Sequence, residues 1–189
     1  GRGIGGRVAT RRAGDLRFDH GAPYVVATSD GFDTCLRELI GTGHAAPWVD
    51  DTGYARTVGT PGMSAIAKGM AVGLDVRLST QITTIHADQA GWCLQFDDTQ
   101  YVASNVVVTV PQPQVAGLLG GAHPLVAQIS DVKMAPGLTL MAAVSGTEPP
   151  VCTNGHGDLL ALITRDCSKP DRPQNEGSSW VAQAGIEFS

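Results

Sequence analysis

The sequence predicts a mixed α/β or α+β fold, because it contains both helical and strand patterns. Apolar residues recur at helical spacing in two segments, whereas they alternate with polar residues over much of the stretch 74–110. The chain has 189 residues, of which 42% are hydrophobic and 16% are charged. A chain of this length and composition can bury a hydrophobic core, which argues against disorder, collagen and a coiled coil.

Two amphipathic helices are predicted in the first 70 residues. The first spans Asp30 to Ile40, with Asp30 as its N-cap and Gly41 as its end. The second spans Pro61 to about Met70, where Thr60 provides the N-cap and the proline occupies the first turn. Each helix presents a row of apolar side chains on one face.

Short strands are predicted over most of the remaining chain. An antiparallel meander is expected around these apolar residues: Val76 and Leu78, Ile82, Trp92 to Phe96, and Tyr101 to Ala103. A continuous β-branched run then follows from Asn105 to Val110 and predicts a parallel strand that is buried on both faces. Three later strands are predicted at Leu138 to Val144, Leu159 to Thr164 and Trp180 to Ala184.

Charge, apolar runs and cysteines disfavour several classes of partner. The 18 acidic and 13 basic residues give a formal charge of −5, with no basic patch for nucleic acid or an anionic membrane. No apolar run reaches the roughly 20 residues that span a bilayer. The four cysteines are widely spaced and form no C-x-x-C motif, which is typical of a reduced compartment. We therefore expect a cytoplasmic protein without nucleic-acid or membrane partners.

The chain opens with the segment Gly1-Arg2-Gly3-Ile4-Gly5-Gly6-Arg7, which matches G-x-G-x-x-G. In dinucleotide-binding folds this motif follows a strand and opens a helix, but nothing precedes Gly1 here. Two interpretations therefore stay open: a loop that approaches an anion, and an ordinary glycine-rich surface turn.

A second cluster, Phe18 to Tyr24, contains an acid, a histidine and two very small residues. Adjacent residues on an extended chain point to opposite faces, so Asp19 and His20 are predicted to be structural rather than an acid–base pair. Gly21 and Ala22 leave room for a flat ligand against the main chain.

Two kinds of catalytic site are disfavoured. The segment Gly62-Met63-Ser64-Ala65-Ile66 lacks the final glycine of the G-x-S-x-G nucleophile elbow, because Ile66 occupies its position. The five histidines share no metal-ligand spacing. We expect neither a serine hydrolase nor a metal site.

Taken in order along the chain, several motifs resemble those of the renalase-like branch of the flavin amine oxidase superfamily. These motifs are Arg2-Gly3-x-Gly5-Gly6-Arg7-x-Ala9-Thr10, Asp19-x-Gly21-Ala22-x-Tyr24, Gly59-x-Pro61-Gly62-Met63-Ser64, the strand Val106 to Val110 ending in Pro111, and Ser168-Lys169-Pro170. The resemblance implies an incomplete three-layer FAD-binding domain with a β-meander, formed by residues 1–28 and 58–115. It also implies an antiparallel-sheet substrate domain, formed by residues 29–57 and 116–189.

The resemblance implies roles for individual residues, although it assigns no catalytic residue. The implied FAD-binding residues are Arg2, Gly5, Gly6, Arg7, Gly21, Ala22, Tyr24, Pro61, Gly62 and Ile82. The first four would meet the diphosphate, to whose oxygens guanidinium groups are well suited. The next three would lie beside the isoalloxazine ring, Pro61 and Gly62 would turn into the helix behind it, and the main chain of Ile82 would hold the adenine edge. Lys169 would lie on the substrate side.

The chain also departs from the family pattern. Pro23 stands where relatives carry glutamine, which removes an amide side chain and a backbone donor next to the flavin. The first strand with its own glycine fingerprint is missing, as is the C-terminal segment that completes the flavin site. We therefore expect an internal fragment of a longer protein.

The function implied is that of an FAD-dependent oxidoreductase. A reduced small molecule would give a hydride to the flavin, and O2 would reoxidise the flavin and yield hydrogen peroxide, so that no general base is required from this chain. Renalase-like relatives act on dihydronicotinamide isomers. The narrower prediction is therefore that such an isomer is the substrate here. Two alternatives remain: a flavin amine oxidase or desaturase acting on amines or polycyclic substrates, and an inactive module that does not hold FAD by itself.

Overall fold

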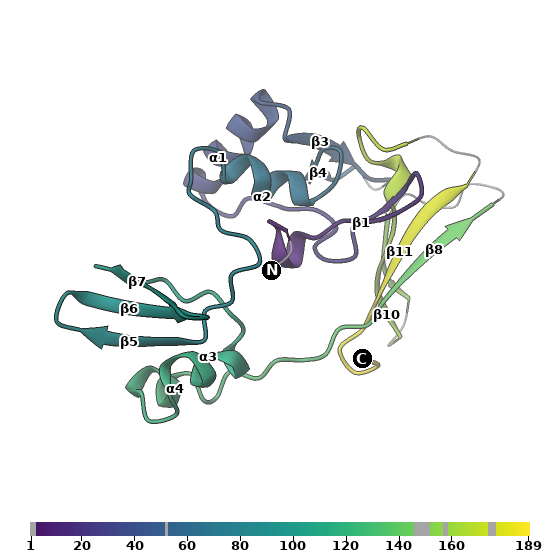
Figure 1. Cartoon of the computed structure of the whole chain (residues 1–189). Coiled ribbons are helices and arrows are strands. Elements are labelled where there is room, and N and C mark those ends of the chain that lie inside the picture. Colours follow the sequence, from purple (N-terminus) through teal and green to yellow (C-terminus); the bar gives the residue numbers. More distant parts are fainter. Residues whose placement is uncertain (1–2, 52, 146–151, 157–158, 174–176) are drawn as a thin grey trace. The chain divides into compact units, whose positions relative to one another are not determined.

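The computed structural model describes residues 3–51, 53–145, 152–156, 159–173 and 177–189 (Figure 1). The chain forms two compact units, of which the smaller comprises Arg77–Ala135 and the larger combines the residues up to Val76 with Pro136–Ser189. Helices and antiparallel strands occur in both units, which confirms the predicted mixed class. The division into cofactor and substrate domains stays a prediction.

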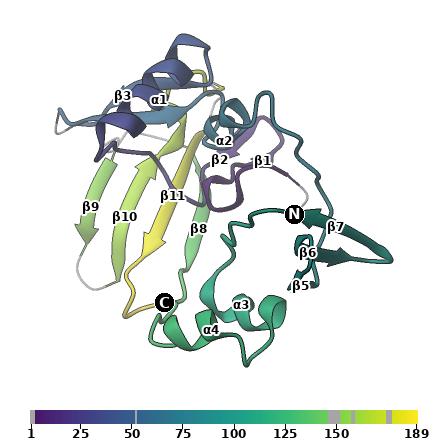
Figure 2. The same cartoon turned by 90° about the vertical axis from the view of Figure 1, so that its left-hand side faces the viewer.

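A four-stranded antiparallel sheet forms one side of the larger unit (Figure 2). Its strands lie in the order β8 (Thr139–Val144), β11 (Ser178–Ala184), β10 (Leu160–Arg165) and β9 (Cys152–His156). Val181 in β11 is 1% exposed and pairs with Thr164 of β10 and Met141 of β8. The three strands that the sequence predicted here are confirmed, whereas β9 was not predicted because its sequence lacks apolar alternation.

Helix α1 (Asp30–Gly41) confirms the first predicted helix, but its cap differs from the prediction. Ser29 is the N-cap, and its hydroxyl accepts a hydrogen bond from the amide of Phe32 at 3.4 Å. Asp30 is instead the first helical residue, where its negative charge interacts favourably with the helix dipole.

None of the described helices is long and apolar enough to cross a membrane.

Helix α2 (Ser64–Met70) begins three residues later than the sequence predicted. The predicted cap, Thr60, donates its hydroxyl proton to the carbonyl of Gly43 at 2.8 Å and is therefore engaged elsewhere. Pro61 lies in the bend that precedes the helix, and the Thr60–Pro61 peptide bond is cis. Met63 occupies the N-cap position and is completely buried.

The principal core of the larger unit lies between the two helices and a two-stranded sheet. This sheet pairs β3 (Ala45–Val49) with β4 (Ala55–Gly59) in antiparallel register. The buried members of the core cluster are Leu36, Leu39, Ala45, Trp48, Val58, Met63, Ile66, Cys152 and Leu162. Because Cys152 and Leu162 come from the four-stranded sheet, the core joins that sheet to the helices.

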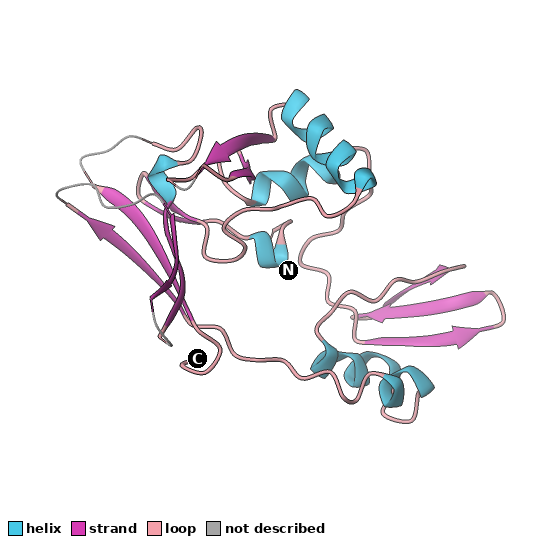
Figure 3. Cartoon of the chain, turned by 180° about the vertical axis from the view of Figure 1, so that it is seen from behind, coloured by secondary structure: helices cyan, strands magenta, loops and turns pink. Residues whose placement is uncertain are grey.

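The smaller unit contains the predicted meander, with two short helices after it (Figure 3). Its strands are β5 (Thr84–Asp88), β6 (Gly91–Phe96) and β7 (Thr99–Ala103), and its helices are α3 (Gln112–Leu119) and α4 (Pro124–Gln128). Predicted strands at Val76 to Leu78 and at Ile82 are wrong, because these residues form no ladder among the described residues. The meander is therefore confirmed in its last two strands, and its first strand lies further along the chain than predicted.

The β-branched run from Asn105 to Val110 is not a strand, which corrects the prediction of a buried parallel one. Its side chains alternate between half-buried and exposed, and Val107 is 86% exposed. A parallel strand needs neighbours on its edges, and no described strand pairs with this segment. The apolar composition is therefore insufficient to produce a strand here.

Candidate functional site

The glycine-rich opening of the chain leaves its main chain approachable. Gly5 and Gly6 have φ angles of 127° and 46°, in the region that favours glycine, and they lead into the 3-10 helix Gly6–Val8. A Cβ atom added to Gly3 or to Gly6 would meet no other atom within 4 Å. Arg2, which was predicted to meet the diphosphate, lies outside the described residues.

The structure brings the opening segment and the second predicted cluster together through the main chain of Arg7. The amide of Ala22 donates to the Arg7 carbonyl at 2.8 Å, and the side-chain amide of Gln183 donates to the Gly21 carbonyl at 2.6 Å. A Cβ atom at position 21 would overlap the Arg7 carbonyl oxygen. Close approach of two backbone segments therefore requires glycine at this position.

Tyr24 packs at the margin of the core. The centroid of its ring lies 4.3 Å from the guanidinium carbon of Arg56. The centroid of the Trp48 ring system lies 6.4 Å away. The indole of Trp48 is buried and belongs to the core cluster. Tyr24 follows Gly21 by three residues, and these contacts with Arg56 and Trp48 hold its ring in place.

Pro61 and Gly62 line a cavity of about 730 Å³ in the larger unit, together with Gly3 and Ile4 of the opening segment. A Cβ atom at Gly62 would come within 2.7 Å of the Thr10 hydroxyl, so the turn packs tightly against the chain that follows the glycine segment. The titratable side chains that line this cavity are Arg12, Arg17, His44 and Lys68, and no acidic side chain of the described residues lines it. The cavity is therefore suited to an anion.

Ile82 lies in the smaller unit, away in the sequence from the other predicted cofactor residues. It lines a cavity of about 760 Å³ formed by Thr80 to Thr83 and by residues around α3. The described residues that line this cavity carry no charge. An uncharged cavity is compatible with a heterocycle, and the role of Ile82 at an adenine edge stays a prediction.

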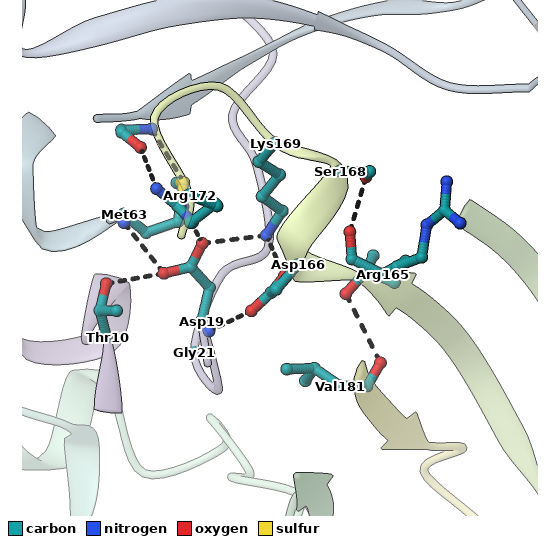
Figure 4. Close-up of polar contacts among 12 residues, drawn as sticks. Thr10, Asp19, Gly21, Met63, Arg165, Asp166, Ser168, Lys169, Arg172 and Val181 are labelled. Atoms are coloured by element: carbon teal, nitrogen blue, oxygen red, sulfur yellow. Dashed lines mark hydrogen bonds and ion pairs between the residues drawn. The ribbon is translucent and has the colours of Figure 1, made fainter. Parts of the chain in front are cut away.

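Both carboxylate oxygens of Asp19, the residue directly after β2 (Leu16–Phe18), have partners in the protein (Figure 4). One of its oxygens lies 2.9 Å from the ammonium of Lys169 and 2.5 Å from a guanidinium nitrogen of Arg172. The other oxygen accepts from the Thr10 hydroxyl at 2.6 Å and from the amide of Met63 at 3.0 Å. Asp19 is completely buried, so these partners replace its hydration.

A second carboxylate completes this cluster. The ammonium of Lys169 lies 2.5 Å from one oxygen of Asp166, and the other oxygen of Asp166 accepts from the Asp19 amide. Arg172 also donates to the Gly59 carbonyl at 3.1 Å. We refer to Asp19, Asp166, Lys169 and Arg172 as the buried charge cluster; its two acids and two bases carry no net charge when all are ionised.

Lys169, which was predicted to lie on the substrate side, has a side chain that is held within the buried charge cluster. Its side chain is completely buried, and its ammonium is paired with both carboxylates of the cluster. The substrate-side role stays a prediction, and the described contacts of Lys169 are within the protein.

The sequence predicted that Asp19 is structural, but it did not identify Asp166 or Arg172 as its partners. These residues follow Asp19 by 147 and 153 positions. The available signal was a short charged stretch, 165–172, between apolar strands, and such a stretch is more often a solvated loop.

The two acids of the cluster have pKa values shifted in opposite directions. Burial alone would raise the pKa of Asp19, but the charges of Lys169 and Arg172, with hydrogen bonds from Thr10 and Met63, hold it below its ordinary value. Burial raises the pKa of Asp166 above its ordinary value, and the negative charge of Asp19 acts in the same direction, against the opposing charge of Lys169. Asp19 is therefore the more strongly ionised member of the pair.

An open glycine-rich main chain beside a basic cavity is typical of proteins that bind the anionic part of a nucleotide. The chain belongs to the family of flavin containing amine oxidoreductases, because the model of that family matches residues 30–147, more than half of the chain. Membership of the renalase-like branch is not shown by this match.

A solved structure supports the fold. It is described as a putative protoporphyrinogen oxidase from Exiguobacterium sp. 255-15, and it matches with a TM-score of 0.52 at 16% sequence identity. The match covers 68% of this chain and 30% of that protein, so this chain spans less than a third of its length. At this identity the likeness concerns the fold alone.

Replacing Asp19 by asparagine should destabilise the protein strongly. The Asp19→Asn variant keeps the shape of the side chain but removes the buried negative charge that Lys169 and Arg172 share, and breaking such a buried pair costs about 3–5 kcal/mol. Urea unfolding near neutral pH measures the change. The matched control is Asp33→Asn, which removes the exposed partner of Arg37 and should change stability by less than about 0.5 kcal/mol. Equal effects of the two substitutions would contradict the assigned role of Asp19.

The contribution of Asp19 to stability should decrease on the acid side. Because its folded-state pKa lies below the ordinary value of about 3.9, the contribution is complete above that value and is lost as the pH falls towards the folded-state pKa. Asp166, whose pKa is raised, acts in the opposite sense: its contribution is present at low pH and is lost as the pH rises through its folded-state pKa. The stability difference between the native chain and Asp19→Asn should therefore shrink as the pH falls below about 4. A difference that does not shrink below this pH would show that the charge of Asp19 is not responsible.

Proposed function

We propose that this chain is part of an FAD-dependent oxidoreductase. The observation that carries the proposal is the match of residues 30–147 to the flavin containing amine oxidoreductase family. The position of the glycine-rich opening supports it, because this segment is fixed against Gly21 and Ala22 and still leaves its own main chain approachable. The activity of the whole protein, its substrate and its cytoplasmic location are parts of this proposal.

The residues present fit the diphosphate of FAD. No atom stands within 4 Å of the space beside Gly3 and Gly6, and the adjoining cavity carries basic side chains. The main chain of Gly5 and Gly6, together with Arg7, would hold the diphosphate, while Gly21, Ala22 and Tyr24 would lie beside the ring system. When bound, the flavin would accept a hydride from a reduced substrate and pass the electrons to O2, giving hydrogen peroxide.

The contribution of this chain's own residues is positional. Asp19 lies two residues before Gly21, and its interactions with Lys169, Arg172 and the Met63 amide fix that part of the main chain. The Arg7 carbonyl is fixed in turn by the Ala22 amide. The buried charge cluster therefore fixes the main chain of both predicted flavin segments, and the proposal requires no proton transfer from its residues.

The narrower proposal is that the reduced substrate is an isomer of a dihydronicotinamide nucleotide, as the sequence resemblance implies. The second candidate is oxidation of an amine or of a polycyclic substrate. The description of the matching family favours the amine of this second candidate. The same scaffold can serve either chemistry, so the substrate has to be measured.

Binding of FAD to the chain should depend on the open space beside Gly3. A Cβ atom at position 3 has no other described atom within 4 Å, so Gly3→Val should leave the fold unchanged and weaken FAD binding by about tenfold or more, the equivalent of one hydrogen bond to a charged group. Quenching of flavin fluorescence measures the affinity. Gly137→Val is the control, because position 137 is equally open. Unchanged affinity in Gly3→Val would place the cofactor elsewhere, and a native chain that binds no FAD would support the inactive-module alternative.

Anaerobic reduction separates the two substrate classes. The flavin-loaded protein is mixed in a stopped-flow instrument with dihydronicotinamide isomers or with an amine, and the flavin absorbance is followed. Rapid bleaching by the isomers is expected. Bleaching by the amine alone would reject the narrower proposal and support the second candidate.

A further inference from the structure

Two arginines that line the basic cavity stand opposite each other in a β-hairpin. Strand β1 (Arg11–Ala13) pairs with β2, and the register places Arg12 directly across from Arg17. Side chains at directly opposed positions share one face of the hairpin, and both arginines line the cavity. Like charges at such a pair are unfavourable when nothing neutralises them.

The described residues provide no neutralising charge for this pair. No ion pair joins Arg12, Arg17 or Lys68 to an acidic side chain in the described part of the chain. The Nε atom of Arg17 is buried and has no hydrogen-bond partner there. A buried donor without a partner costs free energy, so an acceptor that binds the Nε–H of Arg17 would stabilise this site.

The remaining lining points to a compact anion with several acceptor oxygens. Lys68 lies on α2 and His44 follows α1, so positive or protonatable groups come from three separate elements. The Ser64 side chain and the main chain of Gly3 line the same cavity. Guanidinium forks match the oxygens of phosphate in pairs, and a lysine adds a point charge. A volume of about 730 Å³ is in the range of sites for small organic ligands.

We propose that this cavity binds the phosphate group of a phosphorylated small molecule, with Arg12 and Arg17 as its principal ligands. The inference shares its cavity with the flavin proposal and deepens it, because it assigns the phosphate to two side chains, Arg12 and Arg17, that carry no predicted cofactor role. Two sources offer the same chemistry: the diphosphate of a dinucleotide, and the phosphate of a separate compound.

Titration calorimetry with inorganic pyrophosphate tests the site on the full chain. The native protein should bind pyrophosphate, and Arg12→Gln and Arg17→Gln should each weaken binding by about tenfold or more. The matched control is Arg11→Gln, which removes the same charge from the neighbouring position. Arg11 is exposed and does not line the cavity, so this variant should retain the native affinity within about twofold.

Folding of the variants is checked by circular dichroism. If Arg17→Gln does not fold, Arg12→Gln and Lys68→Gln decide the question, because both positions are exposed and tolerate the change. Loss of pyrophosphate binding in these two variants supports the proposal. The proposal is overturned if the native chain binds no pyrophosphate at millimolar concentration, or if the cavity variants bind it as tightly as Arg11→Gln.

Competition with FAD identifies the source of the phosphate. Displacement of pyrophosphate by FAD, with both affinities reduced in Arg12→Gln, assigns the site to the diphosphate of the dinucleotide. Simultaneous binding of FAD and pyrophosphate assigns it to a separate phosphorylated compound. If pyrophosphate binds and FAD does not, the phosphate site stands while FAD binding by this chain fails, so the two proposals are tested separately.

Discussion

The larger unit depends on one interaction, the pairing of the Asp19 carboxylate with Lys169 and Arg172. An unpaired carboxylate at this depth would be too costly to keep ionised. Asp19 can therefore be buried as an anion only because the two cations and the two neutral donors contact it. The cations lie in a segment about 150 residues further along the chain, after β10 and the 3-10 helix Asp166–Ser168. The cluster therefore ties the end of β2 to the segment that follows β10, an inner strand of the four-stranded sheet, and the Met63 amide adds the turn before α2.

The consequence reaches the glycine-rich opening through the main chain. Asp19 fixes the start of the segment that contains Gly21, and the carbonyl of Arg7 lies against Gly21 so closely that no side chain is allowed there. Gln183 in β11 holds the Gly21 carbonyl from the sheet side. An approachable backbone can bind a ligand well only if it is held rigidly, and here the rigidity comes from residues that lie outside the approachable segment.

The sequence predicted the elements that have a local apolar pattern. It did not predict the structure of segments that depend on contacts with distant parts of the chain. Strands β8, β10 and β11 and helix α1 have clear apolar periodicity, so their positions were predicted to within a few residues. The run Asn105 to Val110 has an equally clear composition, but no described strand pairs with it, and composition cannot supply a partner. The start of α2 was misplaced because the Thr60 hydroxyl binds Gly43 rather than capping a helix. Likewise Asp19 was interpreted correctly as structural, while Asp166 and Arg172 could not be matched to it across 147 and 153 positions.

Glycine and arginine carry different kinds of information about this site. Gly21 was predicted from the need of a flat ligand for space, yet the contact with Arg7 alone accounts for glycine at that position, so its presence does not require a ligand. Arg12 and Arg17 received no role from the motif, and their cost is not offset by anything in the described protein: like charges face each other across a hairpin, and one buried donor lacks an acceptor. A small residue can be explained by packing, whereas two like charges that line one cavity are stabilised when an anion binds there. The arginine pair is therefore the more informative guide to what this cavity binds.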